Sequence, residues 1–297
     1  MKSKIIKRKT VSLVLGSGGA RGLAHIGVIR WLEENNYEIR SISGCSIGAL
    51  IGGIYAAGKL DLLEEWMKKI HKTDIISLLD ISWGSGGFFK GERIIDVLRE
   101  LIGDIKIEDL PIPFTAVAAD IASEKEVWLK TGSLFDAIRA SVSLPLFFVP
   151  FDYNGVKLVD GGILNPVPIA PTFNDKTDMI IAVNLGGELK KEKQETLTQI
   201  IEEKENELSF SKSVRNFFQR FLKDDDESQN WGMYDVADKA FDAMQSTIAR
   251  QKIAAYPPDV VVEIARDSCG TLEFDRAAEM IELGYHRAKE AFRKNKF

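Results

Sequence analysis

The sequence predicts an α/β fold in which helices cover a parallel sheet. The first observation is the order strand, loop, helix, strand, turn and helix over residues 11–57, which is a βαβα pattern. The second is that the expected strands are short, continuous apolar runs, as in parallel strands buried on both faces. The chain has 297 residues, enough for one large α/β domain or two small ones.

The first elements follow from local patterns. Residues 11–15 form an apolar run ending in glycine, which predicts a buried strand. Apolar residues at helical spacings predict a helix over 21–36. A second strand is expected at 39–43, and the small apolar run 47–57 predicts a buried helix that ends near Gly58.

The later elements are apolar stretches bounded by turn residues. Residues 61–110 are predicted to be mostly helical, with a glycine-rich loop at 84–87. Strands are expected at 114–119, 126–130, 157–159, 178–184 and 260–264, and helices at 133–140 and 274–294.

Composition and charge restrict the classes of function. Apolar residues make up 45% and charged residues 28%, as in an ordinary globular protein. The net charge of −5 argues against a nucleic-acid partner, because phosphate contacts need concentrated Lys and Arg. The two cysteines, Cys45 and Cys269, make no disulfide framework, which favours a reducing compartment.

Membrane and export signals are weak. The first ten residues are basic, but no long apolar segment follows them, so no signal peptide is expected. No stretch approaches the ~20 apolar residues of a spanning helix. We expect a cytoplasmic protein, with peripheral membrane contact left open.

Residues 188–230 are more charged than the rest of the chain and are interpreted as an insertion. Between residues 210 and 221, aromatic and aliphatic residues recur at helical spacings with basic residues beside them. This pattern predicts a basic amphipathic helix over 209–223. The helix either contacts a membrane surface peripherally or packs its aromatic face on the same domain.

Gly44-Cys45-Ser46-Ile47-Gly48 matches the Gly-x-Ser-x-Gly pattern of a nucleophile elbow. In a strand-to-helix turn this pattern exposes the serine hydroxyl at the edge of the sheet, and the two glycines avoid clashes in the turn. The helix that follows would place its positive end near Ser46. Ser46 is therefore predicted to be a nucleophile; the alternative is a tight turn with a helix-capping serine.

The glycine-rich loop at residues 16–22 has three interpretations. A dinucleotide fingerprint would need glycine where Arg21 stands, and a phosphate-binding Walker loop would need Gly-Lys-Ser/Thr at its end. An oxyanion hole needs only closely approaching backbone N–H groups, which fits best. Arg21 either orients this loop, attracts an anionic head group, or is a solvated residue at the helix start.

A serine nucleophile needs a base, and the chain has three histidines. His25 lies inside the first predicted helix, His71 follows a helix, and His286 lies in the last helix. None suits the mobile base of a Ser-His-Asp triad. Histidines this dispersed also make no zinc motif, so no metal or organic cofactor is expected.

A carboxylate acting directly on the serine is the remaining base. Asp160 comes at the end of a predicted strand, followed by Gly161 and Gly162, within an apolar stretch that could bury it and raise its pKa. Asp120 and Asp152 are rival carboxylates. The alternative for Asp160 is an ordinary turn between strand and loop.

Together these motifs resemble the patatin-like phospholipase family over residues 11–186. The matching segments, in chain order, are Gly18-Gly19-Ala20-Arg21-Gly22, Gly44-Cys45-Ser46-Ile47-Gly48, Ala140-Ser141-Val142-Ser143-Leu144-Pro145 and Asp160-Gly161-Gly162. The resemblance implies a three-layer α/β/α fold with a largely parallel sheet. It also implies a Ser-Asp dyad of Ser46 and Asp160, an oxyanion loop at residues 18–22, and hydrolysis of a lipid or other acyl ester.

The resemblance also bears on domain organisation. It implies one patatin-like domain over residues 1–297, with a catalytic core at 11–186, the charged helical insertion at 188–230, and C-terminal helices and a strand at 235–294. Two other functions stay open: a regulatory or scaffolding protein with weak esterase activity, and a nucleotide-binding protein that uses the glycine loop.

Overall fold

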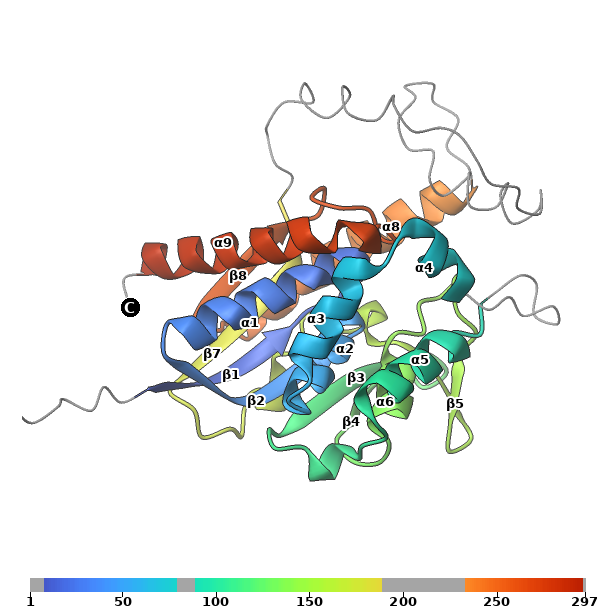
Figure 1. The fold of residues 1–297 in the computed structure, drawn as a ribbon, viewed down its shortest axis with the longest axis horizontal. Coiled ribbons are helices and arrows are strands. Elements are labelled where there is room, and N and C mark those ends of the chain that lie inside the picture. Colours follow the sequence, from blue (N-terminus) through green and yellow to red (C-terminus); the bar gives the residue numbers. More distant parts are fainter. Residues whose placement is uncertain (1–7, 79–88, 189–232, 296–297) are drawn as a thin grey trace, which may run out of the picture.

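The computed structural model describes residues 8–78, 89–188 and 233–295 and has an α/β fold (Figure 1). Helices flank a mixed, mostly parallel sheet, so the predicted fold class is confirmed. The predicted loop at 84–87 and the predicted amphipathic helix at 209–223 lie outside the described residues. Within the described part of the chain, no helix combines the length and apolar character needed to cross a membrane.

The sheet has eight strands in the order β5-β6-β3-β2-β1-β7-β8, with β4 also paired to β3. From β3 to β8 along this order all pairs are parallel, whereas β4, β5 and β6 pair antiparallel. The strands are β1 (Lys9–Leu15), β2 (Tyr37–Cys45), β3 (Phe114–Asp120), β4 (Lys125–Leu129), β5 (Phe151–Tyr153), β6 (Val156–Asp160), β7 (Met179–Gly187) and β8 (Val260–Ala265).

Most helices fall where apolar periodicity predicts them. They are α1 (Ala24–Glu34), α2 (Ile47–Ala56), α3 (Leu60–Lys69), α4 (Lys72–Leu78), α5 (Glu92–Ile102), α6 (Leu134–Ser141), α8 (Met233–Ala255) and α9 (Ala277–Asn295). A short 3-10 helix, Gly19–Leu23, joins the glycine loop to α1.

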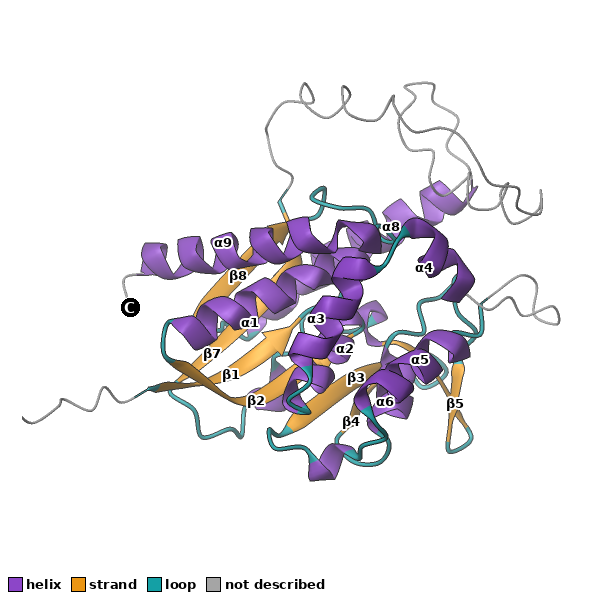
Figure 2. Cartoon of the chain, viewed as in Figure 1, coloured by secondary structure: helices purple, strands orange, loops and turns teal. Residues whose placement is uncertain are grey.

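Alternating side chains of the central strands fill two cores on opposite faces of the sheet. Leu13 and Ile181 belong to the larger core, which the helices α1 and α9 cover. Val14 and Ala182 point the other way and pack with Ala249 of α8. Helices therefore pack on both faces of the sheet. Figure 2 colours the helices and strands by type.

The helices α1 and α9 run side by side across one face of the sheet (Figure 1). Glycine permits this approach, because a Cβ at Gly27 would lie 1.8 Å from the carbonyl oxygen of Ile281. A Cβ at Gly284 would likewise lie 1.9 Å from the carbonyl oxygen of Ala24. The C-terminal helix is thereby seated directly on the first helix.

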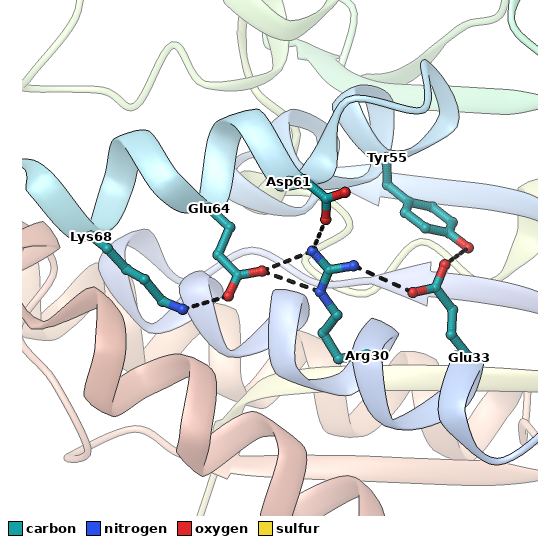
Figure 3. Close-up of polar contacts among 6 residues, drawn as sticks. All are labelled: Arg30, Glu33, Tyr55, Asp61, Glu64 and Lys68. Carbon is teal, nitrogen blue, oxygen red and sulfur yellow. Dashed lines mark hydrogen bonds and ion pairs between the residues drawn. The ribbon is translucent and has the colours of Figure 1, made fainter.

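A surface network of polar side chains fixes α3 against α1 (Figure 3). Its members are Arg30 and Glu33 of α1, Tyr55 of α2, and Asp61, Glu64 and Lys68 of α3. Arg30 Nη2 lies 2.9 Å from Glu64, and Lys68 lies 2.6 Å from the same carboxylate. Burial pushes the pKa of Glu64 up, but these hydrogen bonds outweigh it and hold that pKa below its ordinary value.

Candidate active site

The loops that carry the predicted site residues meet because of strand register. β1 and β2 pair in parallel up to Leu15 and Gly44, so the glycine loop and the elbow leave the sheet side by side. In β3, Val117 pairs with Cys45 of β2, and the next residue pairs with Asp160 of β6. The elbow and the predicted base therefore flank the same stretch of β3.

The elbow has the strained backbone that its sequence predicts. Ser46 has φ 56° and ψ −124°, a conformation that residues other than glycine rarely adopt. A Cβ at Gly44 would lie 2.4 Å from the carbonyl oxygen of Gly48, and one at Gly48 would lie 2.1 Å from that of Leu15. Only glycine fits these two positions, and Ser46 is held at the amino end of the ten-residue helix α2.

Ser141 stabilises the strained turn. The Ser46 N–H donates to the hydroxyl oxygen of Ser141 at 2.9 Å. That hydroxyl in turn donates to the carbonyl of Val117 at 2.6 Å. Ser141 is fully buried at the end of α6, and its two hydrogen bonds connect the elbow to β3.

Asp160 is fully buried, and only one of its carboxylate oxygens is fixed. Oδ1 accepts the Gly162 N–H at 2.7 Å, and the Cys45 thiol lies 3.8 Å from the same atom. Oδ2 is buried and has no hydrogen-bond partner among the described residues. A buried carboxylate oxygen without a partner is costly, and such groups concentrate at functional sites.

Burial is the main reason that the pKa of Asp160 rises to about 6. The Ser46 hydroxyl, the Gly162 N–H and the Cys45 thiol act against this rise, because each stabilises the ionised form. Ser46 is thus close enough to influence the carboxyl group, although the two side chains make no hydrogen bond of standard geometry. Burial and the carboxylate also raise the pKa of Cys45, which keeps that thiol protonated.

Some backbone N–H groups of the glycine loop already have hydrogen-bond acceptors, and others do not. Three N–H groups have backbone acceptors: Gly16 donates to Val183, Ser17 to Pro166, and Ala20 to Thr271. In the described part of the chain, those of Gly18 and Gly19 have none. The loop therefore presents two adjacent free donors, while the Ala20 N–H is already engaged.

Arg21 is buried, with 3% of its surface exposed, so it is not a solvated residue at the helix start. Its Nε donates to the carbonyl of Gly18 at 3.0 Å, and its Nη2 pairs with Asp242 of α8 at 2.7 Å. Of the three interpretations, orientation of the loop is the one that these contacts support. Gly22 packs against the elbow helix, because a Cβ there would lie 2.2 Å from the side chain of Ile47.

None of the three histidines bonds to Ser46. His25 is buried, and its Nε2 donates to the Gly16 carbonyl at 2.9 Å. Burial lowers the pKa of His25 to about 4, despite this bond. His71 is exposed beside α4, and His286 is exposed on α9, where it lies 2.8 Å from Glu282.

The two rival carboxylates have ordinary structural contacts. Asp120 accepts a hydrogen bond from the Ser123 hydroxyl at 2.6 Å, which is the main cause of its lowered pKa. Asp152 pairs with Lys157 at 2.9 Å, and this contact likewise lowers its pKa. Lowered pKa values make both groups weaker bases than Asp160.

Ser46 opens into an apolar cavity of about 130 Å³. Gly19 lines the cavity beside Ser46, and apolar side chains of α2 to α6 form most of its wall, including Trp66 of α3 and Ile94 of α5. No ionisable side chain of the described residues lines it. The cavity can therefore hold a hydrocarbon chain, but it offers nothing to the phosphates of a nucleotide. Nor do three metal-ligating side chains gather anywhere in the described ranges.

Sequence reasoning missed the residues that support this site. Ser141 lies in a segment that matches the family pattern, yet its role depends on a contact with the elbow that spacing does not reveal. Gln245 of α8 donates to the Ser17 hydroxyl at 3.2 Å from 228 residues away. A polar, mostly buried face on α8 would have been the available signal, but its partners follow only from the fold.

The residues matched by a known family cover most of this site. Residues 13–173, which include the glycine loop, the elbow and Asp160, match the patatin-like phospholipase family. An uncharacterized NTE family protein of Mycobacterium tuberculosis is 36% identical, over 95% of this chain and 91% of the relative. The chain belongs to the patatin-like phospholipase family.

Two further similarities are more limited in extent. Neuropathy target esterase sws of Drosophila melanogaster is 33% identical over 60% of this chain, which corresponds to 13% of that much longer protein. Among solved structures, VipD from Legionella pneumophila aligns with a TM-score of 0.47 and 14% identity, over 97% of this chain and 67% of VipD.

Proposed function

We propose that this protein is a serine lipid acyl hydrolase, a carboxylic ester hydrolase of the phospholipase A type that uses a Ser-Asp dyad. Members of its family are typically lipid acyl hydrolases, which supports the reaction class. The observation that carries the proposal is the strained Ser46, facing an apolar cavity, beside a buried Asp160 with one unpartnered oxygen.

In the acylation half of the reaction, the Ser46 hydroxyl attacks the ester carbonyl carbon while Asp160 takes its proton. The carbonyl oxygen becomes an oxyanion, which the N–H groups of Gly18 and Gly19 stabilise. The tetrahedral intermediate then collapses, the carbon–oxygen bond to the alcohol breaks, and Asp160 returns the proton to the leaving alcohol. The product on the enzyme is an acyl ester of Ser46.

In the deacylation half, water attacks the acyl ester and Asp160 accepts a proton from it. A second tetrahedral intermediate forms in the same place and breaks to release the fatty acid, while Asp160 returns the proton to Ser46. Burial makes Asp160 a stronger base than an ordinary aspartate, as both halves require. The side chains of Ser46 and Asp160 make no hydrogen bond of standard geometry, which is compatible with this role, because catalytic hydrogen bonds often tighten only with substrate bound.

The cavity favours an acyl chain as the part of the substrate that enters the protein. Its wall is almost entirely aliphatic and aromatic, so burial of a hydrocarbon chain contributes about 0.8 kcal/mol for each methylene. The neuropathy target esterase relative is named for ester hydrolysis, which agrees with this substrate class. A lipid ester whose polar part stays outside the cavity fits these features.

The central test is Ser46→Ala in the full-length protein. We expect the turnover of p-nitrophenyl esters to fall roughly 10⁴-fold or more, because the nucleophile is gone. Labelling by a fluorophosphonate probe, detected by mass spectrometry at Ser46, should disappear as well. Both are measured against wild type at matched concentrations of folded protein.

Ser123→Ala is the matched control, because Ser123 is exposed in the turn between β3 and β4. This variant should keep wild-type turnover and labelling. Retained turnover in Ser46→Ala would exclude Ser46 as the nucleophile. Folded wild-type protein that neither hydrolyses esters nor takes up the probe would instead favour a regulatory or scaffolding role.

A further inference from the structure

Arg21 connects the glycine loop to a helix far away in sequence. Its Nε donates to the carbonyl of Gly18 at 3.0 Å, and its Nη1 donates to the carbonyl of Arg266 at 2.8 Å. Nη2 and Nη1 both reach the carboxylate of Asp242 on α8, at 2.7 and 3.3 Å. The guanidinium therefore bridges the loop, the end of β8 and α8.

The contact with Gly18 controls the direction of a neighbouring donor. The carbonyl of Gly18 and the N–H of Gly19 belong to one peptide group, and no cis peptide bond is found in the described residues. In a planar trans peptide these two groups point in opposite directions. Arg21 holds the carbonyl on one side, so the Gly19 N–H points to the other, and Gly19 lines the cavity with Ser46.

A buried guanidinium stays in place only if its charge is balanced. Arg21 is 3% exposed, and Asp242, whose side chain is 31% exposed, is the carboxylate that pairs with it. Without Asp242, solvation of the guanidinium would compete with its contact to Gly18. One turn further along α8, Gln245 reaches the Ser17 hydroxyl, so the same face of the helix contacts the loop twice.

We propose that Asp242 is a positioning residue for ester hydrolysis, which holds Arg21 against Gly18 and so fixes the direction of the Gly19 N–H toward the reacting carbonyl. The inference rests on the proposed function. It places part of the oxyanion machinery under the control of α8, outside the residues 13–173 that match the family.

Asp242→Asn tests this role, because it keeps the shape of the side chain and one acceptor oxygen but removes the charge. We expect kcat for a p-nitrophenyl ester to fall about tenfold or more with little change in KM, since small displacements of catalytic groups have effects of this size. Affinity for a trifluoromethyl ketone of the same chain length, which forms a tetrahedral oxyanion on Ser46, should fall by the same factor. Affinity for the corresponding alcohol, which forms no oxyanion, should stay at the wild-type value.

Two further variants separate positioning from a loss of folded protein. Asp242→Glu keeps the negative charge that Asp242→Asn removes, and it should keep most of the wild-type affinity for the ketone. Glu263→Gln removes the same charge from an exposed side chain on β8 and should behave as wild type. Wild-type kcat and ketone affinity in Asp242→Asn, or equal losses in Asp242→Asn and Asp242→Glu, would overturn the inference while the wild type still hydrolyses esters. A wild type without turnover or labelling would instead remove the proposed function itself.

Discussion

Asp160 differs from the other described carboxylates in how its charge is solvated. The side chain is fully buried and its Oδ2 has no partner among the described residues, whereas Asp152 lies on the surface next to Lys157. Poor solvation disfavours the ionised form, which raises the pKa of Asp160 to about 6 and strengthens it as a base. The same burial costs stability whenever the group is ionised.

The raised pKa of Asp160 predicts how the rate of ester hydrolysis depends on pH. If Asp160 must be ionised to accept the Ser46 proton, kcat/KM should fall as the pH drops, to about half of its plateau near pH 6. The profile is measured with a neutral ester between pH 5 and 8.5, with circular dichroism to show that the protein stays folded. A flat profile over this range would contradict Asp160 as the base.

Asp160→Asn is the control for this prediction. The direction in which it changes the free energy of unfolding relative to wild type also follows from the pKa. The folded-state pKa is raised above the ordinary value of 3.8, so Asp160 favours folding below about pH 4 and loses that contribution as the pH rises through about 6. At pH 8 the ionised group costs about 3 kcal/mol, so the asparagine variant should be inactive but no less stable than wild type. An inactive variant that is also unfolded would leave the pH profile as the deciding measurement.

At the scale of single residues, the sequence predicts the proposed catalytic groups better than the residues that support them. Ser46 and Asp160 could be proposed because a nucleophile elbow and a strand-ending Asp-Gly-Gly are local patterns. The partners Ser141 and Cys45 could not, because their roles depend on pairing between β2, β3 and β6. The hydrogen bond from the Ala20 N–H to the carbonyl of Thr271 likewise depends on the tertiary structure.

At the scale of elements, apolar patterns predicted the positions of both helices and strands. The strongly amphipathic α5 buries Ile95, Leu98 and Ile102 and turns charged residues outward, as periodicity requires. Of the antiparallel strands, β4 and β6 were expected at 126–130 and 157–159, but their direction was not predicted. A largely parallel sheet was expected and is found, but no sequence pattern indicated that β6 runs antiparallel to β3, and the three-residue strand β5 is too short to leave a pattern.

The wall formed by α5 provides a prediction about substrate selection. Ile94 lies on the cavity side of this helix, so Ile94→Trp should shorten the space available to an acyl chain. Losing the burial of two or three methylenes costs about 2 kcal/mol, roughly a 30-fold loss in kcat/KM. We expect that loss for p-nitrophenyl decanoate and little change for the acetate ester.

Glu100→Trp is the matched control, because it places the same indole on the exposed face of α5. It should leave the ratio of decanoate to acetate turnover at the wild-type value. An unchanged ratio in Ile94→Trp would show that the acyl chain lies elsewhere. Equal losses on both esters would indicate a damaged active site instead of a shortened cavity.

At the scale of the whole molecule, the C-terminal region contacts both the glycine loop of the candidate site and the helices that cover the sheet. α8 pairs with the glycine loop through Asp242 and Gln245, and α9 packs on α1. Phe292 of α9 lies with its ring centre 4.6 Å from that of Trp31. The sequence predicted a single domain, and these contacts give that prediction a physical basis that can be tested by cooperative unfolding.

Gly284→Ala tests whether the chain unfolds as one domain. Alanine favours a helix by about 1 kcal/mol over glycine, so the substitution would stabilise an exposed helix. Here the new Cβ would lie 1.9 Å from the Ala24 carbonyl, which forces α9 away from α1 and costs about 3 kcal/mol or more. A net loss of about 2 kcal/mol predicts a Tm lowered by roughly 3 °C in a chain of 297 residues.

Whether the helices and the tryptophans of Gly284→Ala unfold in the same transition decides whether the chain is one domain. Melting is followed by circular dichroism for the helices and by tryptophan fluorescence, to which Trp31 of the larger core and Trp66, packed against that core, contribute. A single domain requires both signals to shift together, because α9 and the sheet then unfold in one transition. Lys289→Ala, on the exposed face of α9, should change Tm by little. If Gly284→Ala instead produced an early loss of helix with an unchanged fluorescence transition, the C-terminal helix would be a separate unit, and control of the site from α8 would have to be argued without it.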